Sequence, residues 1–363
     1  MVKPGYRLAL FATLLAVVVV LLGAYTRLTH AGLGCPDWPG CYGFLAVPMS
    51  EHKQALAEAR FPEAPVEVAK GWYEMVHRYF AGSLGLVILG LAAQALRRRG
   101  EPGQPLKLPL LLLGLVILQG AFGMWTVTLK LWPQVVTAHL LGGFATLSLL
   151  FLLTLRLSGA AGVLPPLFAR LRSLAALGLL LVIGQIALGG WVSSNYAAVA
   201  CVDLPTCHGE WWPAMDFANG FHLTQHIGPN YLGGQLDSDE RTAIHMSHRL
   251  GALAVTLVLL LLAWRLRRAG LSRLAGLLLL ALGVQISLGI SNVVFHLPLL
   301  VAVAHNAGGA LLLLTMLLVN YRVCSPVVAT STAKTDTPRA SRPRRIAARS
   351  TPQEHGSLEL PRP

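Results

Sequence analysis

Four histidines fall at matched places in this sequence, and their spacing points to metal binding. His77 and His248 lie 171 residues apart, and His139 and His305 lie 166 residues apart. All four sit in apolar stretches, where ionisable side chains are costly and usually functional. Two imidazoles facing each other from separate helices, across an apolar slot, can hold a haem iron from both sides. We therefore predict that these histidines ligate haem iron, two in each part of the chain.

The histidines belong to an internal repeat. At an offset of 166 residues, Cys35–Cys41 aligns with Cys201–Cys207, and both segments read C-x-D-x-P-x-C. The same offset pairs Gly23 with Gly189, Tyr25 with Trp191, Gln119 with Gln285, and His139 with His305. Because unusual residues recur in the same order, the chain is predicted to hold two copies of one unit.

Other readings of the histidines explain less. A single intramembrane histidine is most often bonded to a neighbouring helix, but that reading does not account for two per unit. Zinc would need a third protein ligand. His245 lies three residues before His248 and offers one, yet its counterpart before His77 is Glu74. A repeated zinc site is therefore not expected.

Glu74 is the chemically important difference between the two copies. It lies one helical turn before His77, on the same face. There it could exchange a proton or stabilise positive charge on a substrate. Equally, it could be a structural partner of Arg78 or a carboxylate favoured near a helix start. Arg78 and Arg249 each follow a ligand histidine and are suited to pair with haem propionates.

The cysteines of the two C-x-D-x-P-x-C segments are predicted to pair locally. The repeat favours disulfides Cys35–Cys41 and Cys201–Cys207. A zinc ribbon would need C-x-x-C, and c-type haem attachment would need C-x-x-C-H, which the sequence lacks. Each pair could be a structural staple of a loop outside the membrane, or it could be redox-active. Both readings stay open.

The composition predicts an all-α integral membrane protein. Only 12% of the 363 residues are charged, against about a quarter in soluble domains. Eight apolar runs are long enough to span a bilayer: 8–28, 76–96, 108–128, 134–156, 173–193, 244–264, 274–294 and 299–321. With the repeat, they predict eight transmembrane helices arranged as two tandem pseudo-symmetric four-helix bundles. The first run lacks a cleavage site and is expected to be a retained helix.

The basic residues predict the orientation. Lys and Arg gather before the first run and between runs two and three, four and five, and six and seven. By the positive-inside rule both termini are then cytoplasmic, and loops 29–75 and 194–243 face outwards. The net charge of +13 therefore sets topology, and nucleic-acid binding is a poor fit. The predicted domains are an N-terminal unit 1–172, a C-terminal unit 173–324, and a disordered basic cytoplasmic tail 325–363.

Several motifs together resemble the cysteine-containing bacterial type of the haem A synthase family. They are the segment from Gly23 to Cys41, Glu74-x-x-His77-Arg78, the stretch from Thr126 to His139, the Cys201–Cys207 loop, His245-x-x-His248-Arg249, and His305-Asn-Ala-Gly-Gly309. The resemblance covers residues 6 to about 322. No position that matches a family ligand departs from the pattern.

The resemblance implies that haem O is oxidised at its C8 methyl group to the formyl group of haem A, through two oxygen-dependent hydroxylations. It implies that the N-terminal unit, with His77, His139 and Glu74, holds the substrate haem. The C-terminal unit, with His248 and His305, would hold a permanent haem b. Expected partners are haem O synthase, the terminal-oxidase assembly machinery and the bilayer. The expected location is the bacterial cytoplasmic (inner) membrane, and a homo-oligomer is compatible with the sequence.

Two other functions use similar residues. A dihaem electron-transfer protein of the cytochrome b type would also need duplicated histidine pairs, and a haem transporter or chaperone would use labile histidine ligation. Glu74, present in one unit only, favours an asymmetric catalytic pair.

Overall fold

The computed structural model describes residues 2–159 and 169–324, and the structural statements below concern these residues. The predicted tail, 325–363, lies outside them. Within the described part, long helices dominate, and extended pairing is limited to two isolated bridges. The described residues also contain three short elements: α2 (Glu51–Arg60), the 3-10 turn η2 (Ala197–Val199) and α7 (Phe217–Gly220).

Eight of the described helices are long and apolar enough to cross a membrane. They are α1 (Tyr6–Leu28), α3 (Val68–Arg97), α4 (Lys107–Thr128), α5 (Pro133–Leu157), α6 (Ala169–Ser194), α8 (Ser238–Arg268), α9 (Ser272–Val294) and α10 (Leu299–Cys324). Each contains or closely overlaps one of the eight predicted spans. The prediction of an all-helical, multi-pass membrane protein is thereby confirmed.

Helices α3 and α8 extend beyond the predicted spans at their N-terminal ends. They have 30 and 31 residues, or about 45 Å at about 1.5 Å per residue, whereas the hydrocarbon core is about 30 Å thick. A capping box between Asp237 and Glu240 starts α8 in a polar segment. His77 and His248 therefore lie about three turns inside their helices. The spans predicted from the sequence begin at residues 76 and 244, after the helices themselves do, because apolar runs mark the membrane boundary and not the helix start.

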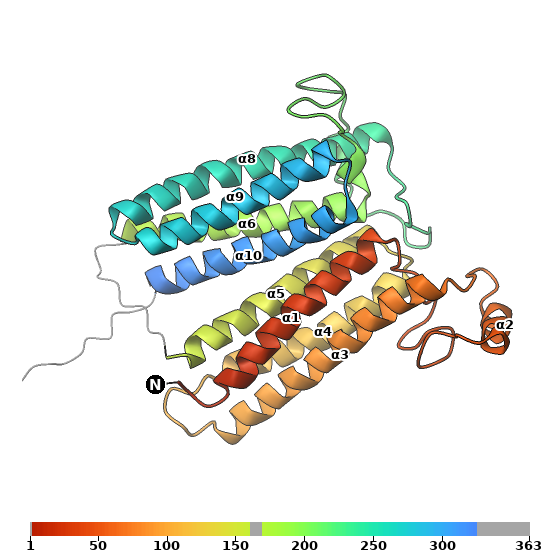
Figure 1. The fold of residues 1–363 in the computed structure, drawn as a ribbon, viewed down its shortest axis with the longest axis horizontal. Coiled ribbons are helices and arrows are strands. Elements are labelled where there is room, and N and C mark those ends of the chain that lie inside the picture. Colours follow the sequence, from red (N-terminus) through yellow and green to blue (C-terminus); the bar gives the residue numbers. More distant parts are fainter. Residues whose placement is uncertain (1, 160–168, 325–363) are drawn as a thin grey trace, which may run out of the picture. The chain divides into compact units, whose positions relative to one another are not determined.

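The long helices pack in two sets of four, which we call the first half (α1, α3, α4 and α5) and the second half (α6, α8, α9 and α10). In the first half, α1 packs against α3 and α5, and α4 packs against α3 and α5. In the second half, α6 packs against α8 and α10, and α9 packs against the same two helices. The halves meet where α1 and α5 contact α10, and where α5 contacts α6 (Figure 1).

Apolar side chains fill the interior and also cover the outside of the helices. Leu147 and Leu259 are fully buried in the shared core. By contrast, Leu86, Ile117 and Leu180 are 70%, 67% and 65% exposed. Such a surface would be unfavourable in water, but lipid tails solvate it. Polar side chains that could take part in chemistry therefore lie between the helices and in the loops at one end of the fold.

Candidate functional site

Each of the four predicted ligand histidines packs against a glycine on a neighbouring helix. The pairs are His77 (α3) with Gly23 (α1), His139 (α5) with Gly123 (α4), His248 (α8) with Gly189 (α6), and His305 (α10) with Gly289 (α9). A Cβ atom added to these glycines would lie 2.9, 3.6, 3.2 and 3.2 Å, respectively, from the Cε1 atom of the histidine. Glycine is therefore what lets each ring lie so close to the next helix.

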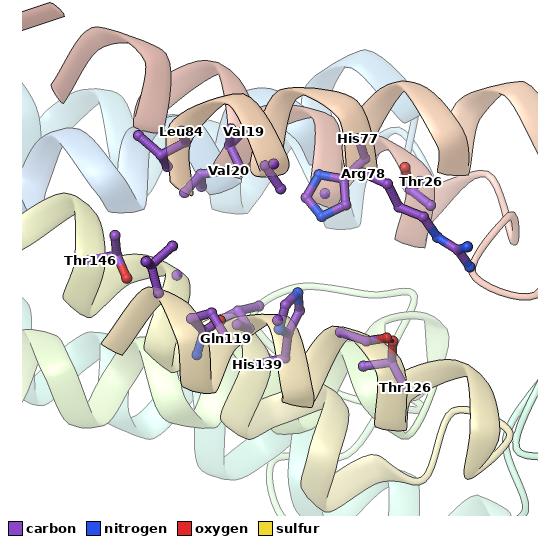
Figure 2. Close-up of a pocket in the computed structure, with 18 of the residues that line it drawn as sticks. Val19, Val20, Thr26, His77, Arg78, Leu84, Gln119, Thr126, His139 and Thr146 are labelled. Carbon is purple, nitrogen blue, oxygen red and sulfur yellow. Dashed lines mark hydrogen bonds between the residues drawn. The ribbon is translucent and has the colours of Figure 1, made fainter. Parts of the chain in front are cut away.

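His77 and His139 face each other across a cavity in the first half (Figure 2). Their ring centroids are 6.4 Å apart and their planes are perpendicular. The cavity has a volume of about 1030 Å³ and a mostly apolar lining from α1, α3, α4 and α5, with Gln119 and Thr126 among its polar groups. The Nδ1 atoms of both rings have no side-chain partner.

This geometry fits a haem held by two imidazoles. If each ring bonded one metal ion through a nitrogen at about 2.0–2.1 Å, the length of zinc–imidazole bonds, the centroids would lie roughly 6 Å apart. The observed 6.4 Å is close to that value. Among the described residues, no group of three or more His, Cys, Asp or Glu could hold a bare metal ion. A haem brings its own ring of nitrogen ligands, so two protein ligands suffice.

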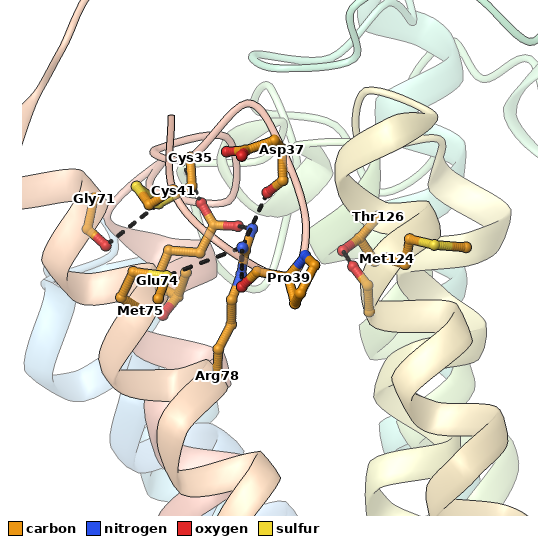
Figure 3. A network of polar contacts seen from close by, with 12 residues as sticks. Cys35, Asp37, Pro39, Cys41, Gly71, Glu74, Met75, Arg78, Met124 and Thr126 are labelled. Atoms are coloured by element: carbon orange, nitrogen blue, oxygen red, sulfur yellow. Dashed lines mark hydrogen bonds and ion pairs between the residues drawn. A yellow bond between two sulfur atoms is a disulfide. The ribbon is translucent and has the colours of Figure 1, made fainter. Parts of the chain in front are cut away.

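Glu74 is buried in the wall of this cavity, with 5% of its surface exposed. Its carboxylate forms an ion pair with Arg78 and accepts a hydrogen bond from the Cys35 amide at 2.9 Å (Figure 3). The ion pair is the one that the structural reading of Glu74 expected. The proton-exchange reading stays a prediction, and the position on the cavity wall is compatible with it.

The loop above the first cavity is closed by a disulfide between Cys35 and Cys41, with an S–S distance of 2.01 Å. Within the loop, the carboxylate of Asp37 accepts hydrogen bonds from the backbone amides of Tyr42 and Gly43, at 2.6 and 2.8 Å. The sequence left the repeated aspartate without a role. The structure shows that it folds the backbone after the second cysteine back onto the loop.

The second loop repeats these contacts. A disulfide joins Cys201 and Cys207, and Asp203 accepts from the amides of His208 and Gly209 at 2.8 and 3.0 Å. The Thr206 hydroxyl donates a further bond at 2.6 Å. This hydroxyl first, and the backbone amides with it, lower the pKa of Asp203 from 3.8 to about 2.

Arg78 and Arg249 hold these loops against the helices. Arg78 donates to the carbonyl oxygens of Asp37 and Gly40, at 3.0 and 2.6 Å, and Arg249 donates to those of Asp203 and Thr206, both at 2.8 Å. Both guanidinium groups are therefore already engaged by backbone oxygen atoms. Their predicted pairing with haem propionates stays a prediction, and the contacts in the structure give them a role in positioning the loops.

His245, the counterpart of Glu74, makes a different contact. It is 6% exposed, and its Nδ1 atom lies 2.8 Å from the carbonyl oxygen of Ala197, as expected for a hydrogen bond. The second half therefore has a histidine–backbone contact where the first half has a buried ion pair.

Arg27 joins the two halves, and the sequence interpretation missed it. Its guanidinium donates to the Ser193 carbonyl oxygen at 2.6 Å and to the Tyr196 hydroxyl at 2.5 Å. It also lies 4.1 Å from the centre of the Tyr196 ring, on which His30 stacks with its centroid 5.5 Å away. Because Arg27 and Ser193 line the first cavity, the second half supplies part of its wall. The available signal was an arginine near the end of the apolar run 8–28.

Three glutamines were also missed as candidates for function. Gln185 and Gln285 lie against the rings of His248 and His305, with Nε2 atoms 3.1 Å from Nδ1 and 3.4 Å from Nε2, respectively. Gln119 lies beside His139 in the first cavity (Figure 2). The repeat aligned Gln119 with Gln285, but sequence spacing alone did not show that these glutamines lie beside the histidines.

The chain is similar to known proteins over nearly all of the described residues. A model of the cytochrome oxidase assembly protein family (COX15-CtaA) matches residues 6–317. A haem A synthase of Shewanella oneidensis is 50% identical over 317 residues, which cover 87% of this chain and 94% of that protein. A haem A synthase of Methylobacterium radiotolerans is 32% identical over 332 residues, covering 85% and 87%. One of Nitrosospira multiformis is 30% identical over 346 residues, covering 85% and 90%.

Proposed function

This chain belongs to the cytochrome oxidase assembly protein family (COX15-CtaA), and from this premise we propose that it is a haem A synthase. It would oxidise the C8 methyl group of haem O to the formyl group of haem A by successive oxygen-dependent hydroxylations, and so supply haem A to terminal oxidases. The observation that carries the proposal is the 50% identity to a haem A synthase over 87% of the chain. The facing histidines of the first half support it independently.

We assign the two halves different haems. The first half would hold substrate haem O, and then product haem A, between His77 and His139. The second half would hold a permanent haem b between His248 and His305. The large cavity between the first pair and the glutamine contacts of the second pair support this division. Bound haem b would supply the one-electron chemistry that protein side chains lack.

The residues of the first cavity then have separable roles. His77 and His139 orient the substrate, and the apolar lining keeps water from its reacting edge. Glu74 can take up or release a proton at its carboxylate oxygens, while Arg78 and the Cys35 amide fix the orientation of that carboxylate. The disulfide-closed loop above them covers the outer end of the cavity, since Trp38 and Pro39 belong to the lining.

The same proposal includes the arrangement in the membrane. The eight helices would form two tandem pseudo-symmetric four-helix bundles in a bacterial inner membrane, with both termini in the cytoplasm and the disulfide loops outside. Domains 1–172, 173–324 and 325–363 follow from this arrangement. Haem O synthase and the oxidase assembly machinery would be its partners, the first as the source of substrate and the second as the recipient of product.

Expression together with haem O synthase, in a host that makes no haem A, tests the function. Chromatography of the extracted haems should show haem A or its alcohol precursor beside haem b. Haem b alone, under full haem O supply, would instead favour a dihaem electron-transfer protein or a haem carrier. A variant with His139→Ala is the matched control, because it should keep haem b while giving no haem A.

A further inference from the structure

Gln185 makes close contacts with His248 from the neighbouring helix. Its Nε2 atom donates to the His248 carbonyl oxygen at 2.8 Å and lies 3.1 Å from Nδ1 of the same residue. Nε2 also lies 3.5 Å from Nε2 of the ring. The Oε1 atom is buried without a partner, and it is the atom that can accept a proton from Nδ1 once the amide is turned over, because an amide NH2 group only donates. No other side chain of the described residues hydrogen-bonds this Nδ1 atom.

A glycine on α8 makes room for this amide. Gly251 lies one turn after His248, and a Cβ atom added there would collide with Oε1 of Gln185. The same arrangement recurs on α10, where Gly308 faces Gln285, and on α5, where Gly142 faces Gln119. At three of the four histidines, a glutamine therefore lies over a glycine three residues beyond the histidine.

The fourth histidine, His77, lacks both members of this arrangement. At the repeat offsets, Val19 takes the place of Gln185 and Phe80 takes the place of Gly251. Val19 lines the cavity near His77 (Figure 2), and the Nδ1 atom of His77 has no side-chain partner. The glutamine on the neighbouring helix and the glycine after the histidine are thus both absent at His77, whose helix also carries Glu74.

The physical consequence concerns the ligand bond. A histidine that binds a metal through one nitrogen carries a proton on the other, and a partner for that proton fixes the tautomer and the ring orientation. Removing such a partner typically costs about 10–100-fold in metal affinity. His248 has a side-chain amide in place to do this, whereas His77 has only a backbone contact with Val19 and the packing around its ring.

We propose that Gln185 is a positioning residue that holds His248 as a tight iron ligand, and that Val19, in the equivalent place, leaves His77 as the readily exchanged ligand of the first half. The inference rests on the proposed function, in which the second haem stays and the first is substrate and must leave as product. The proposal attributes the different retention of the two haems to side chains that do not themselves bind iron. Gln119 and Gln285, which match each other, do not contribute to the difference.

The test measures haem release from the purified, haem-loaded protein in detergent. Excess apomyoglobin captures released haem, and chromatography of the captured pigment separates haem b from haem O and haem A. Gln185→Val should speed the release of haem b about 10–100-fold and shift its low-spin absorption spectrum. Gln185→Glu keeps an acceptor at the same length and should retain slow release. The double variant Val19→Gln, Phe80→Gly should slow the release of haem O or haem A.

The outcomes separate this inference from the proposed function. Haem b release from Gln185→Val at the unchanged rate, with an unchanged spectrum, overturns the inference and leaves the function standing. Equal acceleration in Gln185→Val and Gln185→Glu would also contradict it, because the hydrogen bond would then have no role. Protein that contains no haem at all, under full haem supply, overturns the proposed function itself. Gln119→Val is the matched control, since it should leave haem b release unaltered.

Discussion

Helices α3 and α8 occupy equivalent places in the repeat, yet the polar residues around their histidines differ in kind. On α3, Glu74 forms a buried ion pair with Arg78, and the histidine ring faces an apolar cavity without a side-chain partner. On α8, the equivalent of Glu74 is His245, which bonds a backbone carbonyl oxygen, and His248 is contacted by Gln185. The histidine of α3 therefore lies near a buried ion pair and an open cavity, whereas that of α8 is contacted by a side-chain amide.

The comparison indicates how two halves of similar structure can serve different functions. The glycine that accommodates each ring, the disulfide loop and the arginine that holds it occur in both halves. In the proposed function, these shared parts build a site for a haem. The unshared parts, Glu74 and the valine at position 19 in place of a glutamine, lie on one helix pair, and we propose that they distinguish the substrate site from the cofactor site.

Among the variants that test the difference between the halves, His248→Ala should have the largest effect on haem binding and stability. Loss of this ligand should remove the low-spin haem b spectrum and destabilise the protein by about 3–4 kcal/mol, the contribution of a ligand present well above its dissociation constant. His77→Ala should leave the haem b spectrum in place. Absorption spectra and thermal unfolding of the two purified variants measure both effects. A retained haem b spectrum in His248→Ala would show that the cofactor assignment is wrong.

The next effect concerns Glu74 alone. Glu74→Gln keeps the side-chain length and one acceptor oxygen for Arg78 or the Cys35 amide. It removes the ionisable carboxyl, so conversion of haem O should fall about 10²–10⁴-fold while haem b stays bound. His245→Gln, the matched change in the second half, should leave conversion within a few-fold of the unchanged protein. The yield of haem A per bound haem b, measured by chromatography, distinguishes a proton-exchange role of Glu74 from a structural one. Unaltered yield in Glu74→Gln would return this residue to a purely structural role.

The sequence predicted much of this comparison. Eight spans, the repeat and the exchange of Glu74 for His245 follow from apolar length and residue spacing, because these patterns are local. The Gln185 contact did not follow, since α6 and α8 meet only in the fold and position 185 has no glutamine counterpart in the first half. The starts of α3 and α8 were also misplaced, because apolar runs record contact with lipid and say nothing of helix that continues into water.

A smaller effect should come from the glycines that face the rings. A Cβ atom at position 23 would lie 2.9 Å from Cε1 of His77, so Gly23→Ala must displace the ring, whereas 3.6 Å at Gly123 and His139 is an ordinary contact. Gly23→Ala should therefore weaken haem binding in the first half about tenfold, and Gly123→Ala should barely alter it. Titration of both variants with haem O measures the affinities. Equal affinities would mean that the ring has room to move.

The smallest expected effect is a difference in the pH at which the two disulfide loops open. The pKa of Asp203 is lowered from 3.8 to about 2, first by the Thr206 hydroxyl and then by backbone amides such as that of Gly209. A carboxyl group whose pKa is lowered on folding stabilises the loop above the unfolded value of 3.8, and this stabilisation is lost as the pH falls towards 2. Thr206→Ala removes the leading cause, so the second loop should open at a higher pH, by about half to one unit for one hydrogen bond.

Pepsin is active in this acidic range and cleaves opened loops, so digestion between pH 4 and pH 2 reports the transition. Thr206→Ser keeps the hydroxyl and should match the unchanged protein. The first loop has Gly40 in the place of Thr206. A Cβ atom at position 40 would collide with the carbonyl oxygen of Phe44, so the first loop has no room for the equivalent hydroxyl. If Thr206→Ala and Thr206→Ser open at the same pH, the hydroxyl does not hold Asp203, and the loops differ for another reason.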